Sequence, residues 1–460
     1  QRQSTGHLIG SLLSSIRSGA TIPGDGSEGT MKRTGFYATR CIIAGLALGL
    51  LAVANASAQE ITLRLNRVDS FIPHFSVKRE MNAAYRPELD RILATMHRRM
   101  RAGENMSCTA QIFEEVHWLV NYTDRAGDIE RRLQDLRDSL GMDDQSFAAR
   151  QDPADGSFAP CIEDWLWRFF RSVDPLKELA HQGLEPAVAL KIWEPVDTPE
   201  ELTAFMRDLL VSELDSGHNK RKELNLAVTA LGQLLWLDYT DRVFPEHLDR
   251  EALAEALRRF VDEEWQDPET GYWGAWFDDE GTIRKTQDLS MTFHIISYRG
   301  GQVDRLREIG QTTMAIKEIR YPFGWDTGGT QNNHHAYDIA RLVNLTWSEL
   351  DAASRAHAAA QLFLMSARSL AFSIDTTGAF DPSGYTTVAE AYYFGVSFFE
   401  EIGLFGNPVP RTTMTRMVNT ERLFHQIEDN LGRLDPADPW VAATQRKLDG
   451  LREQIALGAN

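Results

Sequence analysis

The segment from Tyr321 to Val343 reads YPFGWDTGGTQNNHHAYDIARLV, a glycine-rich turn that leads into an amphipathic helix. Apolar residues recur at helical spacing from Ala336 onward. Asparagine at a helix start can cap the free backbone N–H groups. One of Asn332 and Asn333 is therefore expected to be the cap, and the other, with His334 beside it, is left for another task. The segment predicts both a structural unit and a candidate site.

The turn glycine of this unit recurs along the chain. Gly217, Gly271, Gly324 and Gly378 are separated by 54, 53 and 54 residues, which indicates a repeated helical hairpin. Each is followed by a helix rich in polar and aromatic groups, and more ordinary amphipathic helices lie between. The richer helices are expected to begin near Lys222, Asp288, Asn333 and Thr386. This alternation favours an α/α toroid, complete or incomplete, whose inner helices line a cleft; an open solenoid of helix pairs is the alternative.

The rest of the chain after residue 85 is also helical in pattern, and alternating β-branched stretches are nearly absent, so the predicted fold class is all-α. Residues 59–190 form an N-terminal helical segment, and residues 191–460 form the toroid region of the same domain. The predicted helices are Pro87–Arg101, Ala110–Asn121, Asp128–Leu140, Pro199–Leu214, Glu223–Leu237, Arg250–Trp265, Val303–Ile319 and Ser354–Phe372, with Thr413–Arg433 and Pro439–Ala456 closing the domain.

Residues 1–58 are predicted to be a leader and a signal peptide. Met31-Lys32-Arg33 precedes an uncharged apolar run, 41–54, and the small residues Ala56-Ser57-Ala58 then favour cleavage before Gln59. No later stretch approaches the twenty apolar residues that a membrane span needs. The expected location is periplasmic or secreted, with no membrane partner.

Two cysteines remain after the signal peptide, Cys108 and Cys161. In an oxidising compartment they are expected to form a disulfide, although two buried free thiols are the alternative. The net charge of −18, with five Lys and Arg against two Asp and Glu in residues 1–58, leaves −21 on the remainder. Such a chain has no basic stripe for nucleic acid, whereas a local basic cleft could still bind an acidic polymer.

Proton-handling side chains recur at equivalent places of the repeat, which predicts that they share one cleft. They are His218 and Asn219; Gln287, Asp288, His294, Tyr298 and Arg299; Asn332, Asn333, His334, His335 and Tyr337; and Tyr385, Glu390, Tyr392 and Tyr393. The aromatics in the turns, Tyr272, Trp273, Trp276 and Trp325, are expected to stack on sugar rings or to plug the rim. A metal is not expected, because the adjacent His334 and His335 point about 100° apart on a helix and no H-E-x-x-H motif occurs.

Asn332-Asn333-His334 followed by Tyr337 resembles the Asn-Asn-His element of α/α-toroid polysaccharide lyases, the alginate lyase and heparinase-like group. The segment from Thr377 to Phe394 looks like the later, tyrosine-bearing element of that family. The resemblance implies that the asparagine helps to neutralise a uronate carboxylate, that the histidine lies at the catalytic centre, and that a tyrosine of a later inner helix transfers a proton.

Members of that group usually carry an arginine just before the tyrosine, but here no arginine lies between Arg368 and Arg411. Arg299, Arg320 or Arg284 would then supply the positive charge. The expected reaction is β-elimination on a polyuronate of the alginate or glucuronan type, without metal or organic cofactor. The catalytic residues would be Asn333, His334, Tyr393 or Tyr392, and Arg299; the substrate-binding residues would be Asn332, His335, Tyr337, His294, Tyr298, Trp273, Trp276, Tyr385 and Arg284.

Two alternatives stay open on the same residues. A glycoside hydrolase would use two carboxylates from Asp288, Asp326 and Glu390. A glycan-binding protein would keep the aromatic residues without turnover.

Overall fold

The structure is a computed structural model of the 460-residue chain. It describes residues 74–102, 104, 106–123, 125–141, 151–213, 219–237, 239, 241–279, 282–326, 332–383, 385, 388–405, 419–434, 436 and 438–458. The predicted leader and signal peptide lie outside these residues, as do Gly217, His218 and the start of the helix expected near Thr386.

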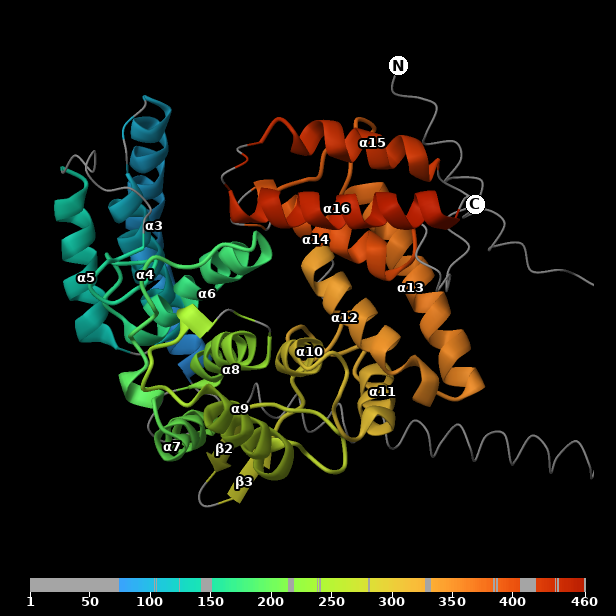
Figure 1. Ribbon diagram of the computed structural model, residues 1–460, viewed down its shortest axis with the longest axis horizontal. Helices are drawn as coiled ribbons and strands as arrows, with labels where there is room; N and C mark the ends of the chain where they lie inside the picture. The colour runs from blue at the N-terminus through green and yellow to red at the C-terminus, as the bar shows by residue number, and fades with distance from the viewer. Residues whose placement is uncertain are drawn as a thin grey trace, which may run out of the picture. The chain divides into compact units, whose positions relative to one another are not determined.

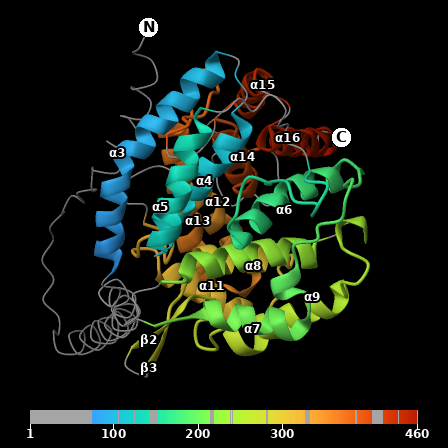
Figure 2. The same ribbon diagram turned by 90° about the vertical axis from the view of Figure 1, so that its left-hand side faces the viewer.

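Three helices open the described chain: α3 (His74–Arg101), α4 (Ser107–Tyr122) and α5 (Ala126–Ser139). They pack in sequence order and lie side by side in Figure 2. α3 is longer than expected, because Pro87 lies inside it instead of beginning it.

From α6 onward, every second helix along the chain forms a series in which each member contacts the next. These alternate helices are α6 (Trp165–His181), α8 (Arg221–Trp236), α10 (Leu289–Tyr298), α12 (Asn333–Leu345), α14 (Val388–Glu401) and α16 (Pro439–Gly458). Each packs against its successor, as Figure 1 shows for α8 to α16, and α16 also contacts α6. An ion pair of 2.6 Å between Arg446 of α16 and Glu178 of α6 joins the two ends of the series.

The intervening helices cover the alternate ones. They are α7 (Pro199–Leu210), α9 (Arg250–Arg259), α11 (Leu306–Ala315), α13 (Ala352–Phe372) and α15 (Thr420–Leu431). α7 and α9 both pack on α8, α11 and α13 on α12, and α15 on α14 and α16. α9 continues as the π-helical turn η3 (Phe260–Trp265), and short 3-10 turns lie at Glu194–Val196 (η1), Asp241–Val243 (η2) and Trp347–Glu349 (η4). α8 is buried along almost its whole length, as expected of an interior helix.

A small sheet departs from the all-α expectation. β1 (Val211–Glu213) pairs in parallel with β2 (Trp276–Asp279), and β2 pairs antiparallel with β3 (Thr282–Lys285). The register sets Trp276 opposite both Val211 and Lys285. Strands of three and four residues are too short to leave an alternating pattern in the sequence. The described chain is nevertheless mainly helical.

The expected helix starts agree with the structure at three places. α8 begins at Arg221, α10 at Leu289 and α12 at Asn333, each within one residue of the expected position. The glycines Gly271, Gly324 and Gly378 lie in the segments that precede α10, α12 and α14. Gly271 and Gly378 have φ of 71° and 84°, a conformation that favours glycine. A Cβ at Gly324 would lie 2.2 Å from the carbonyl oxygen of Ile316. The repeat therefore marks real turns.

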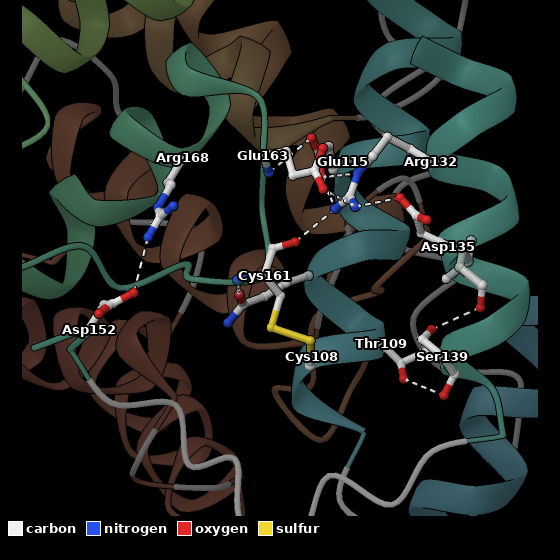
Figure 3. The surroundings of a disulfide bond; sticks show 12 residues. Cys108, Thr109, Glu115, Arg132, Asp135, Ser139, Asp152, Cys161, Glu163 and Arg168 are labelled. Carbon is white, nitrogen blue, oxygen red and sulfur yellow. Dashed lines mark hydrogen bonds and ion pairs between the residues drawn. A yellow bond between two sulfur atoms is a disulfide. The ribbon is translucent and has the colours of Figure 1, made fainter. Parts of the chain in front are cut away.

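The expected disulfide between Cys108 and Cys161 is confirmed, with a Cα–Cα distance of 5.5 Å (Figure 3). It ties α4 to the segment that precedes α6, and a buried ion pair reinforces the same link. The Arg132 guanidinium donates through Nε to Glu115 at 2.9 Å and through Nη2 to the Cys161 carbonyl at 2.8 Å. α6 lies in the segment 59–190 that was expected to be helical, but its bounds were not predicted, because the helical pattern is weaker there and Pro175 interrupts it.

In the part of the chain that the structure describes, no helix has the length and apolar character to cross a bilayer.

Candidate functional site

The start of α12 is held by a cap and by a tyrosine from the segment before α14. Asn332 is the N-cap, and its Oδ1 accepts from the backbone N–H groups of His334 and His335 at 2.9 and 3.4 Å. The Tyr385 hydroxyl donates to the same oxygen at 3.4 Å and accepts from the Asn333 N–H at 2.8 Å. The two asparagines are thus divided as expected, with Asn332 as the cap. Tyr385 positions the helix start.

Asn333 faces α13. Its amide nitrogen donates to Ser373 Oγ at 3.0 Å, its oxygen accepts from Ser369 Oγ at 2.7 Å, and only 1% of its surface is exposed. Both ends of the amide therefore bind α12 to α13. The neutralising role expected for Asn333 would require this side chain to give up bonds to the serines.

His334 is a partly exposed histidine of the tract. Its ring stacks on Phe394 of α14 at 4.0 Å and 19°, and 32% of the side chain is exposed. Neither ring nitrogen has a hydrogen-bond partner among the described residues; the Asp338 carboxylate is 3.8 Å from Nε2. Burial holds the pKa of His334 well below its ordinary 6.5, and His335, His294 and Lys222 lower it further. His334 is neutral at pH 7 and can accept a proton.

Asp338 is a buried carboxyl that the sequence analysis did not single out. It is fully buried, and the Tyr321 hydroxyl donates to its Oδ2 at 2.9 Å. Burial raises the pKa of Asp338 well above 3.8. Tyr321 also stacks on the ring of His335 at 3.5 Å. The i, i+4 spacing from His334 was the available signal, since it places both side chains on one helix face.

Tyr337 and Tyr393 bring two phenols to the same place from α12 and α14. Both are partly buried, and the described residues form no hydrogen bond with either hydroxyl. The Nζ of Lys447 is 6.0 Å from the ring centroid of Tyr337 and 5.5 Å from that of Tyr393. Burial raises the pKa of Tyr337 well above 10.0, and the nearby Tyr393 and Glu401 raise it further. At neutral pH Tyr337 keeps its proton.

Tyr392 lies apart from these phenols. It is 3% exposed and packs edge-on against Phe380 at 5.2 Å. Neighbours on a helix point about 100° apart, and Tyr392 packs on Phe380 whereas Tyr393 packs on Trp440. Tyr393 lies beside Phe394, which stacks on His334, and 5.2 Å separate the ring centroids of Tyr393 and Phe394.

α10 contributes a paired histidine and tyrosine. His294 Nδ1 and the Tyr298 hydroxyl are 3.0 Å apart, as their shared face allows. Burial lowers the pKa of His294 to about 3, with further contributions from Lys222 and Arg221. Burial raises the pKa of Tyr298 well above 10.0, and charges on Asp174 of α6 and Tyr393 of α14 add to it. Tyr298 therefore faces side chains of other alternate helices.

Lys222 is the cation whose charge acts on His294, His334 and His335. Burial lowers its pKa to about 8, Arg221 lowers it further, and Asp288 opposes the shift. Its charge in turn lowers the pKa values of His294, His334 and His335. The sequence analysis noted Lys222 only as a helix start. We call Lys222, His294, Tyr298, His334, Tyr337, Asp338, Tyr393 and Lys447 the polar cluster.

The arginines expected to supply charge lie elsewhere. Arg299 caps the C-terminus of α10, forms an ion pair with Asp262 and lies 5.8 Å over the ring of Trp236. Arg284 lies on β3, opposite Phe277. Arg299 is thus paired with Asp262 and not with a member of the polar cluster.

The turn aromatics divide between interior and surface. Trp273 is fully buried, and its indole N–H donates to the Val261 carbonyl at 2.9 Å. Its expected role as a sugar platform is wrong, because a glycan cannot reach a side chain that fills the interior. Trp276 is partly buried on β2, with Lys285 Nζ 4.2 Å from its ring centroid. Its expected role stays a prediction.

One carboxylate of the hydrolase alternative, Asp288, has a structural role. Asp288 is fully buried, and both its oxygens bind Arg221, at 2.5 and 3.0 Å. It also caps α10 by accepting from the Met291 N–H. A carboxylate in this position holds α8 to α10. Among the described residues, no three His, Cys, Asp or Glu side chains are grouped as metal ligands.

A hollow of about 200 Å³ lies away from the polar cluster, lined by Trp118, Arg125, Asp164, Trp165, Leu166, Phe205, Leu209 and Glu223. Arg125 and Asp164 form an ion pair there, and Asp164 caps α6. These groups serve local structure, whereas His334, Tyr337 and Tyr393 of the polar cluster form no side-chain hydrogen bond with the described residues. The cluster is therefore the better candidate site.

Comparison of this chain with family models, with curated proteins and with solved structures gives no match.

Proposed function

We propose that this chain is an exported polysaccharide lyase that cleaves a uronate-containing glycan of the alginate or glucuronan type by β-elimination. One observation carries the proposal. His334, Tyr337 and Tyr393 lie together with accessible polar atoms that have no hydrogen-bond partner among the described residues, next to the cations Lys222 and Lys447. A neutral base, phenols and a cation are the groups that this elimination requires.

We also propose that the alternate helices form the inner layer of an α/α toroid. The contact series from α6 to α16 and the contact between its two ends support this arrangement. The intervening helices would form the outer layer. A polar cluster built from α8, α10, α12, α14 and α16 would then face the interior of the toroid, where a glycan chain could bind.

The reaction assigns a role to each group. His334 takes the proton from C5 of the uronate. The electron pair of the C5–H bond then forms the C4–C5 double bond as the C4–O bond breaks. Tyr393 or Tyr337 gives its proton to the departing glycosidic oxygen. Lys222 takes the place of the expected arginine. Its positive charge stabilises the uronate carboxylate as negative charge from C5 spreads onto it. Asn333 would then support the start of α12.

The first test uses the whole chain and a panel of polyuronates. We expect ultraviolet absorbance from the unsaturated uronate product with alginate or glucuronan. Reducing ends that appear without this absorbance would instead indicate the glycoside hydrolase. Binding without either signal would indicate a glycan-binding protein.

The pH dependence should follow the neutral state of His334. Because burial lowers its pKa well below 6.5, the base stays unprotonated at pH values where an ordinary histidine would be charged. We therefore expect kcat/KM to persist as the pH falls through 6.5 and to decline only at a clearly lower pH. A pH–rate profile of the free enzyme measures this. An acidic limb centred at 6.5 or above would contradict the assignment of His334 as the base.

A further inference from the structure

The beginning of α16 places an indole and an ammonium beside the polar cluster. Trp440 and Lys447 are seven residues apart, so they share a helix face, and their α-carbons lie about 10 Å apart along the axis. Neither was expected from the sequence to take part in the site. Both are partly buried, and 24% of the Lys447 side chain is exposed.

Trp440 is linked to His334 through aromatic contacts. Its ring lies 4.8 Å from Tyr393 and 5.7 Å from Phe394, and Phe394 stacks on His334. A ligand group that stacks on Trp440 would therefore lie close to the ligand group that contacts His334.

Trp440 differs from the core tryptophans Trp265 and Trp273. Trp265 and Trp273 are fully buried, and their indole N–H groups donate to the carbonyls of Gly274 and Val261, both at 2.9 Å. Trp440 keeps exposed surface, and the described residues provide no acceptor for its N–H. A partly exposed indole with an unused donor suits a ligand with both apolar and hydroxyl groups.

Lys447 supplies charge on the same face. Its Nζ binds Glu400 at 3.1 Å and lies beside the rings of Tyr337 and Tyr393. An ammonium with three donors can bind a ligand carboxylate while it keeps its bond to one glutamate. The Tyr393 ring lies 4.8 Å from the Trp440 ring and 5.5 Å from the Lys447 Nζ, so neighbouring units of one ligand can contact both groups.

We propose that Trp440 and Lys447 form a subsite for an oligouronate chain that lies along α16. One sugar unit stacks on the indole, and the carboxylate of a neighbouring unit binds the ammonium. This inference rests on the proposed function and names residues that select an acidic chain over a neutral one.

The test measures binding separately from turnover. The variants Trp440→Ala and Lys447→Met are made in the His334→Ala chain, and isothermal titration calorimetry is run with size-defined oligouronates and with neutral oligosaccharides of equal length. We expect each variant to weaken oligouronate binding about tenfold, in line with the loss of one aromatic or one charged contact. Lys447→Met should also lose most of the preference for the acidic ligand. Trp440→Phe keeps an aromatic face but loses the N–H, so its affinity for the oligouronate should lie between those of Trp440→Ala and the parent.

Two matched controls lie outside the polar cluster. Trp347→Ala removes a partly buried tryptophan on η4, and Lys317→Met removes a lysine paired with Glu318. Both should bind oligouronates as the parent does, and thermal unfolding should show that Trp440→Ala and Trp440→Phe are folded. In the chain with His334 intact, Trp440→Ala should raise KM more than it lowers kcat.

The outcomes separate the two proposals. If the chain with His334 intact cleaves a polyuronate but folded Trp440→Ala and Lys447→Met bind it as tightly as their parent, the subsite is wrong and the lyase stands. If the intact chain neither cleaves nor binds any polyuronate, the proposed function is wrong and the subsite falls with it.

Discussion

His334→Ala should lower turnover on the cleaved polyuronate by about a hundredfold or more, while glycan binding persists. The reason lies in its surroundings. The ring is accessible, it is neutral because burial lowers its pKa, and no described residue uses its nitrogens. A group in this state contributes through proton transfer, and removal of the base affects the transition state more than the bound substrate. Initial rates and calorimetry on the same variant give the two quantities.

Three further variants make the result specific. His357→Ala removes an exposed histidine of α13 and should leave turnover unchanged. Glu390→Gln should have a much smaller effect than His334→Ala, whereas the hydrolase alternative requires the reverse order. His334→Asn keeps a polar side chain against Phe394 and should be as inactive as His334→Ala. Near-normal elimination by a folded His334→Ala would contradict the assignment of His334 as the base, and His294 with Tyr298 would be tested next.

The sequence predicts the parts of this site that depend on local pattern. A capping asparagine needs only its neighbours along the chain, so the start of α12 could be predicted with a cap at Asn332 or Asn333, and the structure shows that the cap is Asn332. The glycine spacing locates the turns before α10, α12 and α14, because positive φ and close backbone approach restrict those positions to glycine. The cysteine pair follows from export and from an even count.

Other parts depend on packing between distant segments. The sequence does not show which of Trp273 and Trp440 is buried, yet Trp273 fills the interior and Trp440 stays partly exposed. Lys447 meets Tyr337 only because α16 lies against α14, and more than a hundred residues separate the two side chains. Asn333 faces the serines of α13 for the same reason. Such burial is decided by tertiary contacts, and periodicity within one helix does not record it.

Glu115→Ala should lower the free energy of unfolding by about 3 kcal/mol or more, the range measured when one partner of a buried ion pair is removed. The Glu115 and Arg132 side chains are 1% and 4% exposed. Glu115 also accepts from the backbone N–H groups of Glu163 and Asp164 at 3.1 and 2.7 Å. The alanine variant leaves a buried guanidinium and two backbone donors without this acceptor. Arg132 keeps contacts with Asp135 and Glu163, which limit the loss.

Urea denaturation with the disulfide intact measures the effect, because Cys108–Cys161 then holds the same two segments in every variant. Arg131→Met is the control, since Arg131 pairs with the exposed Glu163 and an exposed pair contributes less than about 1 kcal/mol. Glu115→Gln keeps an acceptor for the backbone donors and should recover part of the loss. The double variant Glu115→Leu, Arg132→Met removes both charges and should be more stable than Glu115→Ala, because no unpaired buried charge remains. A Glu115→Ala chain as stable as Arg131→Met would show that water or another carboxylate reaches Arg132, and that the disulfide alone joins α4 to the segment before α6.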